Sequence, residues 1–157
     1  MVDPITFVLH AGMIIANSLI VKYLFDLEKD NCECAIMDYR RKYIIGYSLY
    51  AIIAAGLGIL GLGKYIKRTF IGSNTVVLSL FSATVLVASI LNVVFVFQYV
   101  DSLKKMSCQC SESQYKTLMQ VIAGFQAAGI GFIIFGLAYV VFMIGTMSSF
   151  QKTLMKA

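Results

Sequence analysis

"DNCECAIMDYRRKY", residues 30–43, recurs in altered form as "MSCQCSESQYKTLM", residues 106–119, and the two segments hold all four cysteines of the chain. At a gapless offset of 76 residues, the matched positions are Cys32 and Cys108, Cys34 and Cys110, Tyr23 and Tyr99, Leu27 and Leu103, Lys29 and Lys105, and Tyr39 and Tyr115. At the same offset Arg40 matches Lys116, so both copies carry a positive charge at this position. Chance does not readily match both cysteine pairs, so the sequence predicts two copies of one helix–loop–helix hairpin.

The regions around these loops are strongly apolar. Of the 157 residues 59% are hydrophobic, only 13% are charged, and the mean hydropathy is +0.82. Four stretches of 18 to 35 residues contain no charged side chain, namely Pro4–Val21, Tyr43–Gly63, Thr75–Val100 and Thr117–Gln151. A helix needs roughly 20 apolar residues to cross the hydrocarbon core of a bilayer. The sequence therefore predicts an all-α membrane protein with four transmembrane helices.

The repeat and the four stretches together divide the chain. We expect a single four-helix transmembrane domain, 1–157, made of repeat one (1–63), a linker (64–74), repeat two (75–147) and a short amphipathic tail (148–157). The first stretch lacks a basic segment before it, so we interpret it as a retained helix rather than a cleaved signal peptide. Asp3 is its expected N-cap and Pro4 its first helical residue.

Each predicted hairpin crosses the membrane twice and returns to its starting side. Both repeats then have the same topology, related by an axis along the membrane normal. Both Cys-x-Cys loops are expected on one face of the membrane, and the termini and linker on the other. Counting Lys and Arg gives eight on the cysteine face and five on the other. That count favours a cytoplasmic cysteine face, whereas disulfides favour the opposite orientation, so the orientation stays open.

Three states of the cysteines are compatible with the sequence. Disulfides have three connectivities for four cysteines, a Cys₄ zinc site would use the same four ligands, and a redox pair would use a thiol at a helix start. Paired zinc ligands usually have two or more residues between them, whereas each pair here has only one, and neither loop contains a histidine. We therefore favour structural disulfides among Cys32, Cys34, Cys108 and Cys110, and expect no cofactor.

The polar side chains within the predicted spans that we take as candidates for transport or catalysis are His10, Asn17, Ser18, Asn92, Gln120 and Gln126. No Asp, Glu, Lys or Arg lies in the middle of a span. Interhelical hydrogen bonds explain such residues more simply than a proton or ion path does. The prediction is a structural protein rather than an enzyme. The alternative is a small transporter, channel or thiol-active membrane protein that uses His10, Asn17, Asn92 and the paired cysteines.

Small residues recur every three or four positions in the second and fourth spans, at Ala51, Ala54, Ala55, Gly58 and Gly61 and at Ala123, Gly124, Ala127, Ala128 and Gly131. Such stripes let helices approach closely. We expect these two helices to pack against each other, or the stripes to mediate self-association. The fourth stretch exceeds the thickness of a bilayer, and its end, "MSSFQKTLMKA", is predicted to lie on the membrane surface.

The loops also carry charged and aromatic residues. Loop one, Lys22–Lys42, has five basic and five acidic residues, and such a mixed surface favours contact with proteins over nucleic acid. The expected partners are the lipid bilayer and neighbouring membrane proteins, with self-association as a further candidate interaction and no nucleic acid. The residues predicted to dock onto a partner are Tyr39, Arg40, Arg41, Tyr115 and Lys116.

A small four-span protein with Cys-x-Cys loops, whose second span opens with "CECAIMDYRRKYI", resembles the short membrane proteins of large icosahedral DNA viruses such as chloroviruses. The resemblance rests on residues 31–45, with an echo at 107–119. It implies a minor capsid or virion inner-membrane protein whose loops link an internal bilayer to the capsid shell above it. Loop two departs from the pattern, because "SQYKTLM" lacks the double arginine, and its partner contacts are left unassigned.

Overall fold

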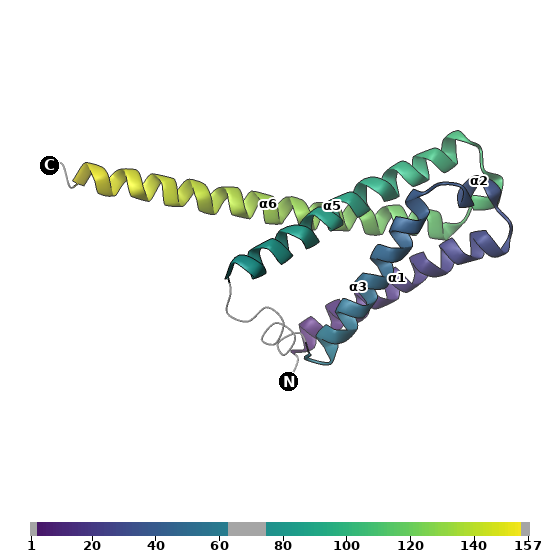
Figure 1. Ribbon diagram of the computed structural model, residues 1–157, viewed down its shortest axis with the longest axis horizontal. Coiled ribbons are helices and arrows are strands. Elements are labelled where there is room, and N and C mark those ends of the chain that lie inside the picture. The colour runs from purple at the N-terminus through teal and green to yellow at the C-terminus, as the bar shows by residue number, and fades with distance from the viewer. Residues whose placement is uncertain (1–2, 63–74, 155–157) are drawn as a thin grey trace.

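The computed structural model describes residues 3–62 and 75–154, which form four long helices and two short ones (Figure 1). In chain order the elements are α1 (Pro4–Lys29), α2 (Glu33–Ile36), α3 (Arg40–Ile59), α5 (Thr75–Lys105), the 3₁₀ helix η2 (Gln109–Ser111) and α6 (Gln114–Leu154). All four long helices contain stretches apolar enough and long enough to cross a membrane. The predicted all-helical fold with four spans is confirmed, and the chain is a multi-pass membrane protein.

The start of α1 follows from its first residues. Asp3 is the N-cap, and its carboxylate accepts a hydrogen bond from the backbone N–H of Thr6 (2.9 Å) and a second from the Thr6 hydroxyl. Pro4 follows at the first helical position, where a missing N–H costs nothing. The two bonds from Thr6 lower the pKa of the Asp3 carboxyl. The predicted cap is confirmed.

The long helices are arranged in a ring. α1 packs against α3 and α6, and α5 packs against α6 and α3. In Figure 1 the hairpins α1–α3 and α5–α6 meet at the end that carries α2 and diverge away from it. Both Cys-x-Cys loops lie at that common end, as the repeat predicted. The start of α1 and the C-terminal end of α6 lie away from it.

The buried core follows the repeat. Four positions of α1 are buried together with the four positions of α5 that lie 76 residues later: Ile20 and Val96, Tyr23 and Tyr99, Leu24 and Val100, Leu27 and Leu103. Their spacing of three and four residues places each set on one face of its helix. All eight lie in the half of the spans nearest the cysteines, so the core is concentrated at the loop end.

The offset between the repeats changes within the loops. The 76-residue offset holds as far as Ala35 and Ser111, which are both fully buried. Beyond them, equivalent positions lie 75 residues apart. Thus Asp38 Oδ1 accepts from the backbone N–H of Arg40 (3.0 Å), and Ser113 Oγ accepts from that of Tyr115 (3.1 Å). Between equivalent positions repeat two is therefore one residue shorter, and the 3₁₀ turn η2 takes the place of α2.

The shorter loop alters one pairing that the sequence suggested. The buried residues of the second helix in each hairpin match at an offset of 75: Arg41 with Lys116, Ile44 with Met119, and Ser48 with Ala123. Lys116 is therefore the structural counterpart of Arg41, and its pairing with Arg40 at the gapless offset was wrong.

The predicted seam between the second and fourth spans is also wrong. α3 and α6 lie diagonally in the ring, and the small-residue face of α3 packs on α1 instead. Ala51 and Ala55 are buried, and a Cβ added at Gly58 would collide with the ring of His10 in α1. On α6, a Cβ at Gly124 or Gly131 would meet nothing within 4 Å. On α6, Ala123 is buried in the core, whereas Gly124 and Gly131 do not mediate a close approach.

α6 is one continuous helix of 41 residues, which at 1.5 Å per residue is about 60 Å long. The tail predicted for 148–157 thus begins inside this helix, and residues 155–157 lie outside the described part of the chain, as do those of the predicted linker 64–74. Figure 1 shows the C-terminal part of α6 extending well beyond the other helices.

Candidate functional site

The cysteine loops begin with the same turn in both repeats. α1 ends in a Schellman motif, in which Asn31 takes a left-handed conformation (φ 51°) and the N–H of Cys32 donates to the Leu27 carbonyl (3.0 Å). α5 ends in the same way: Ser107 has φ 49°, and the N–H of Cys108 donates to the Leu103 carbonyl (3.2 Å). The helix ends themselves therefore position the first cysteine of each pair.

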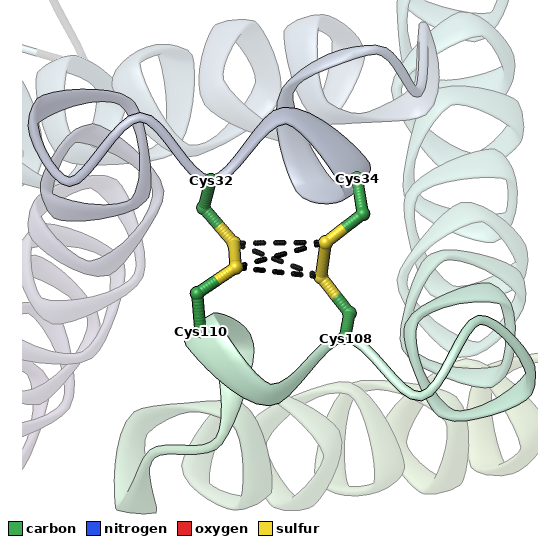
Figure 2. Close-up of side chains that lie close together, drawn as sticks. All are labelled: Cys32, Cys34, Cys108 and Cys110. Atoms are coloured by element: carbon green, nitrogen blue, oxygen red, sulfur yellow. Dashed lines mark hydrogen bonds between the residues drawn. A yellow bond between two sulfur atoms is a disulfide. The ribbon is translucent and has the colours of Figure 1, made fainter.

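The four cysteines form two disulfides, both of which cross between the repeats (Figure 2). Cys32 is bonded to Cys110, with 5.9 Å between their Cα atoms, and Cys34 is bonded to Cys108, with 6.2 Å. Exchanging the two repeats turns one disulfide into the other. A local twofold axis therefore passes between the bonds. Of the three connectivities open to the sequence, the structure has the one in which the first cysteine of each repeat is bonded to the second cysteine of the other.

Two tyrosines join the loops in the same symmetric manner. The hydroxyl of Tyr23 donates to the carbonyl of Ser111 (2.9 Å), and that of Tyr99 donates to the carbonyl of Ala35 (3.1 Å). Both rings are buried. Because Tyr23 matches Tyr99 and Ala35 matches Ser111, each bond is the symmetry mate of the other. The 76-residue identity of the tyrosines was the signal for this role.

Two of the predicted docking residues point inward instead. Arg41 is buried, and its Nε and Nη2 donate to the carbonyl of Leu24 (3.2 and 3.0 Å) while Nη2 also pairs with Glu28. Lys116 is likewise buried and pairs with the carboxylate of Glu112. These cations hold their own loops and helices together, so they offer little surface to a partner.

The other predicted docking residues reach the surface. Tyr39 is 66% exposed and Tyr115 38% exposed. The guanidinium of Arg40 lies 5.5 Å from the centre of the Tyr39 ring and donates to the carbonyl of Gln98 in α5 (3.1 Å). The sequence analysis missed Met37, which is 86% exposed at the tip of loop one. An apolar side chain outside a charged-residue-free stretch, two residues from an exposed tyrosine, was the available signal.

Four of the polar residues singled out inside the spans, His10, Asn17, Asn92 and Gln126, are bonded to one another, to neighbouring helices or to their own helix. Asn92 Nδ2 donates to Gln126 Oε1 (3.1 Å), Gln126 Nε2 donates to the Tyr47 hydroxyl (2.7 Å), and that hydroxyl contacts Ser89 Oγ (2.9 Å). This chain links α5, α6 and α3. His10 Nδ1 bonds the carbonyl of Thr6 (2.7 Å), and Asn17 Nδ2 donates to that of Met13 (2.8 Å).

A cavity of about 440 Å³ opens between α3 and α5. Its lining includes Tyr43, Tyr47 and Thr84. The hydroxyl of Tyr43 donates to the carbonyl of Ala88 (3.0 Å), and that of Thr84 donates to the carbonyl of Leu80 (2.9 Å). These hydroxyls already have partners, so the cavity offers apolar volume and few polar groups that could orient a solute.

Comparisons of the chain with protein-family models, with curated proteins and with solved structures found no match.

Proposed function

We propose that this protein is a structural membrane protein whose linked loops dock onto a neighbouring protein. The linked loops are residues 30–39 and 106–113. The observation that carries the proposal is the exposure of Met37 (86%) and Tyr39 (66%) on a loop that two disulfides fix in place. Within the spans, lipid covers exposed apolar side chains. Met37 lies beyond them, where an exposed apolar group favours contact with protein.

The linked loops are well suited to docking because little freedom remains to be lost on binding. Two disulfides, the hydrogen bonds of Tyr23 and Tyr99 and the buried cation Arg41 all restrain the backbone near Met37. Ordering an exposed loop on binding costs free energy, and a loop that is already ordered avoids that cost. Exposed aromatic and methionine side chains are also the types enriched in protein interfaces.

The intramembrane polar residues support a structural role over transport. Asn92, Gln126 and Tyr47 bond across three helices, which stabilises the bundle. Such bonds are worth about 0.6 kcal/mol each on average in membranes. A pathway for ions would need polar groups that face water. In the described part of the spans, the polar residues singled out as transport candidates, His10, Asn17 and Asn92, bond to protein atoms.

Site-specific photocrosslinking in the native membrane tests the proposal. A photoreactive amino acid at position 37 or 39 should give one dominant protein adduct, identified by mass spectrometry. The same probe in place of Phe132, which is 79% exposed on α6, should label lipid. The Tyr39→Ala variant should weaken the adduct from position 37 while leaving the melting temperature within a few degrees. Labelling of lipid alone from positions 37 and 39 would refute docking.

The more specific form of the proposal places the protein in the inner membrane of a large icosahedral DNA virus, as a minor capsid component. It rests on the resemblance of residues 31–45 and 107–119 to the short membrane proteins of such viruses. In that setting the crosslinked neighbour would be a capsid protein, and the protein would remain with virions whose bilayer is intact. Recovery of the adduct only in host membranes would contradict this setting and leave docking itself intact.

A further inference from the structure

The four sulfur atoms form a compact cluster that is more regular than two disulfides require. All four lie within 4.8 Å of one another. The sulfurs within each pair are 3.8 Å apart for Cys32 and Cys34 and 3.7 Å for Cys108 and Cys110. Across the repeats, Cys32 lies 3.6 Å from Cys108, and Cys34 lies 3.6 Å from Cys110. Figure 2 shows these four contacts around one centre.

Those distances are the edges of a tetrahedron. A Zn²⁺ ion bound by four thiolates at about 2.3 Å places its sulfurs about 3.8 Å apart. Four of the six edges of the cluster already measure 3.6 to 3.8 Å, and the two remaining edges are the disulfides. Breaking both bonds lets each sulfur move outward by roughly 1 Å to reach a regular zinc tetrahedron.

We propose that, when both disulfides are reduced, the four cysteines bind one Zn²⁺ ion. This ion then links the two loops instead of the disulfides. Spacing alone argues against zinc, because the cysteines of each pair are separated by a single residue. The structure removes that objection. Each Cys-x-Cys pair supplies one edge of the tetrahedron at 3.7 or 3.8 Å, and the twofold axis brings the second pair to the opposite edge.

The chemistry needs a reductant of the dithiol class. Two molecules of dithiol deliver four electrons and four protons; both S–S bonds break, four thiols form, and each dithiol closes to its own disulfide. The four thiols then bind one Zn²⁺ and release four protons, giving a zinc tetrathiolate of charge −2. The protein thus exchanges two covalent links for one metal centre without separating the loops.

The loops stay together after reduction because other contacts do not involve sulfur. The Tyr23 and Tyr99 hydroxyls bond across the repeats, and both Schellman turns hold Cys32 and Cys108 on their helix ends. Cys32 and Cys108 are buried, whereas Cys34 is half-buried and Cys110 exposed. A metal ion could therefore enter from the side of Cys110 with two ligands already oriented.

Cobalt substitution tests the site directly. The detergent-purified full chain is reduced with a phosphine, freed of metal, and titrated with Co²⁺, whose visible spectrum reports tetrahedral thiolate ligation. We expect saturation at one Co²⁺ per chain and displacement of Co²⁺ by one equivalent of Zn²⁺. A spectrum without the tetrahedral thiolate bands would overturn the proposal, and so would saturation at half an equivalent, which means two chains sharing one ion.

Variants separate the site from nonspecific thiol binding. Cys34→Ser should shift the Co²⁺ spectrum to that of a three-thiolate site and weaken binding at least tenfold, while Met37→Ala should leave both unchanged. One equivalent of Zn²⁺ should also raise the melting temperature of the reduced protein, but not that of the oxidised protein. Unchanged binding in Cys34→Ser would refute the four-ligand site. The docking proposal is tested on the oxidised protein, so the two can fail independently.

Discussion

The two disulfides should contribute to stability in a strongly non-additive way, because they close almost the same loop. The pairs are 78 and 74 residues apart in sequence. Once Cys32 and Cys110 are joined, Cys34 and Cys108 are held two residues from that bond on either side, so the second disulfide closes only a small ring. Removing either disulfide alone leaves the long loop closed. Removing both opens it.

The chain-entropy relation gives the magnitudes. Closing a loop of either length destabilises the unfolded state by about 4.5 kcal/mol, whereas closing a ring of about six residues adds only about 2 kcal/mol. Losing one disulfide should therefore cost about 2 kcal/mol, and losing both about 6 to 7 kcal/mol. The bilayer already confines the helices of the unfolded chain, so these are upper values. The predicted order of stability among the variants stays the same when both free energies are smaller.

Three double variants make the comparison. Cys32→Ser with Cys110→Ser removes one disulfide, and Cys34→Ser with Cys108→Ser removes the other. Cys32→Ser with Cys34→Ser removes both, because its two cysteines belong to different bonds. All carry the same number of substitutions. Unfolding in detergent by added dodecyl sulfate can be followed by tyrosine fluorescence, since the chain has nine tyrosines and no tryptophan.

The third variant should unfold at a clearly lower dodecyl sulfate fraction than the first two, which should lie close to each other and near the unmodified protein. All four should retain four membrane spans. Equal losses in the three variants would refute the shared-loop reasoning, because each bond would then act by itself.

Three further predictions concern single positions, each measured by the same unfolding assay. Gly58→Ala should destabilise the α1–α3 pair by about 1 to 3 kcal/mol, because the added Cβ collides with His10. The control Gly56→Ala, whose Cβ would meet nothing within 4 Å, should be neutral or slightly stabilising. Equal effects of the two substitutions would contradict the contact between Gly58 and His10. Ser107→Gly should stabilise the protein by up to about 1 kcal/mol, because Ser107 has φ 49°; a loss would show that its side chain matters more than its backbone. Arg41→Lys should cost about 1 to 2 kcal/mol, since a lysine cannot give both Nε and Nη2 bonds to one carbonyl; no change would show that these bonds add nothing.

The amino-acid sequence was sufficient for the architecture. Four charge-free stretches and two cysteine pairs at one offset predicted four spans and two hairpins with both loops at one end, because bilayer thickness and chain reversal leave few alternatives. The cap of α1 could also be predicted, because Asp3 and Pro4 act through local bonds to their own helix. Features set by a few neighbouring residues, or by the bilayer, are readable in advance.

Features that depend on which helices touch were not readable in the same way. The small-residue stripes of the second and fourth spans look alike in sequence, yet a glycine meets a neighbouring helix closely only on α3, where Gly58 faces His10, and not at Gly124 or Gly131 of α6. Likewise, the match of Arg41 with Lys116 depends on a change of the repeat offset from 76 to 75 within the loops, and a gapless comparison cannot reveal that. Met37 was missed because a single apolar residue outside the charge-free stretches is a weak signal until its exposure is known.

The use of all four cysteines in one duplicated motif follows from the twofold axis. A single cysteine in each repeat could bond its own copy only if it lay on the axis, and it would give one link. A Cys-x-Cys pair flanks the axis, so the first cysteine of each repeat meets the second cysteine of the other, as Cys32 meets Cys110 and Cys34 meets Cys108. The tyrosine bonds from Tyr23 and Tyr99 obey the same exchange. One motif repeated once therefore gives two disulfides and two hydrogen bonds at the end of the molecule where the core lies, while the diverging ends of the hairpins are left to the lipid.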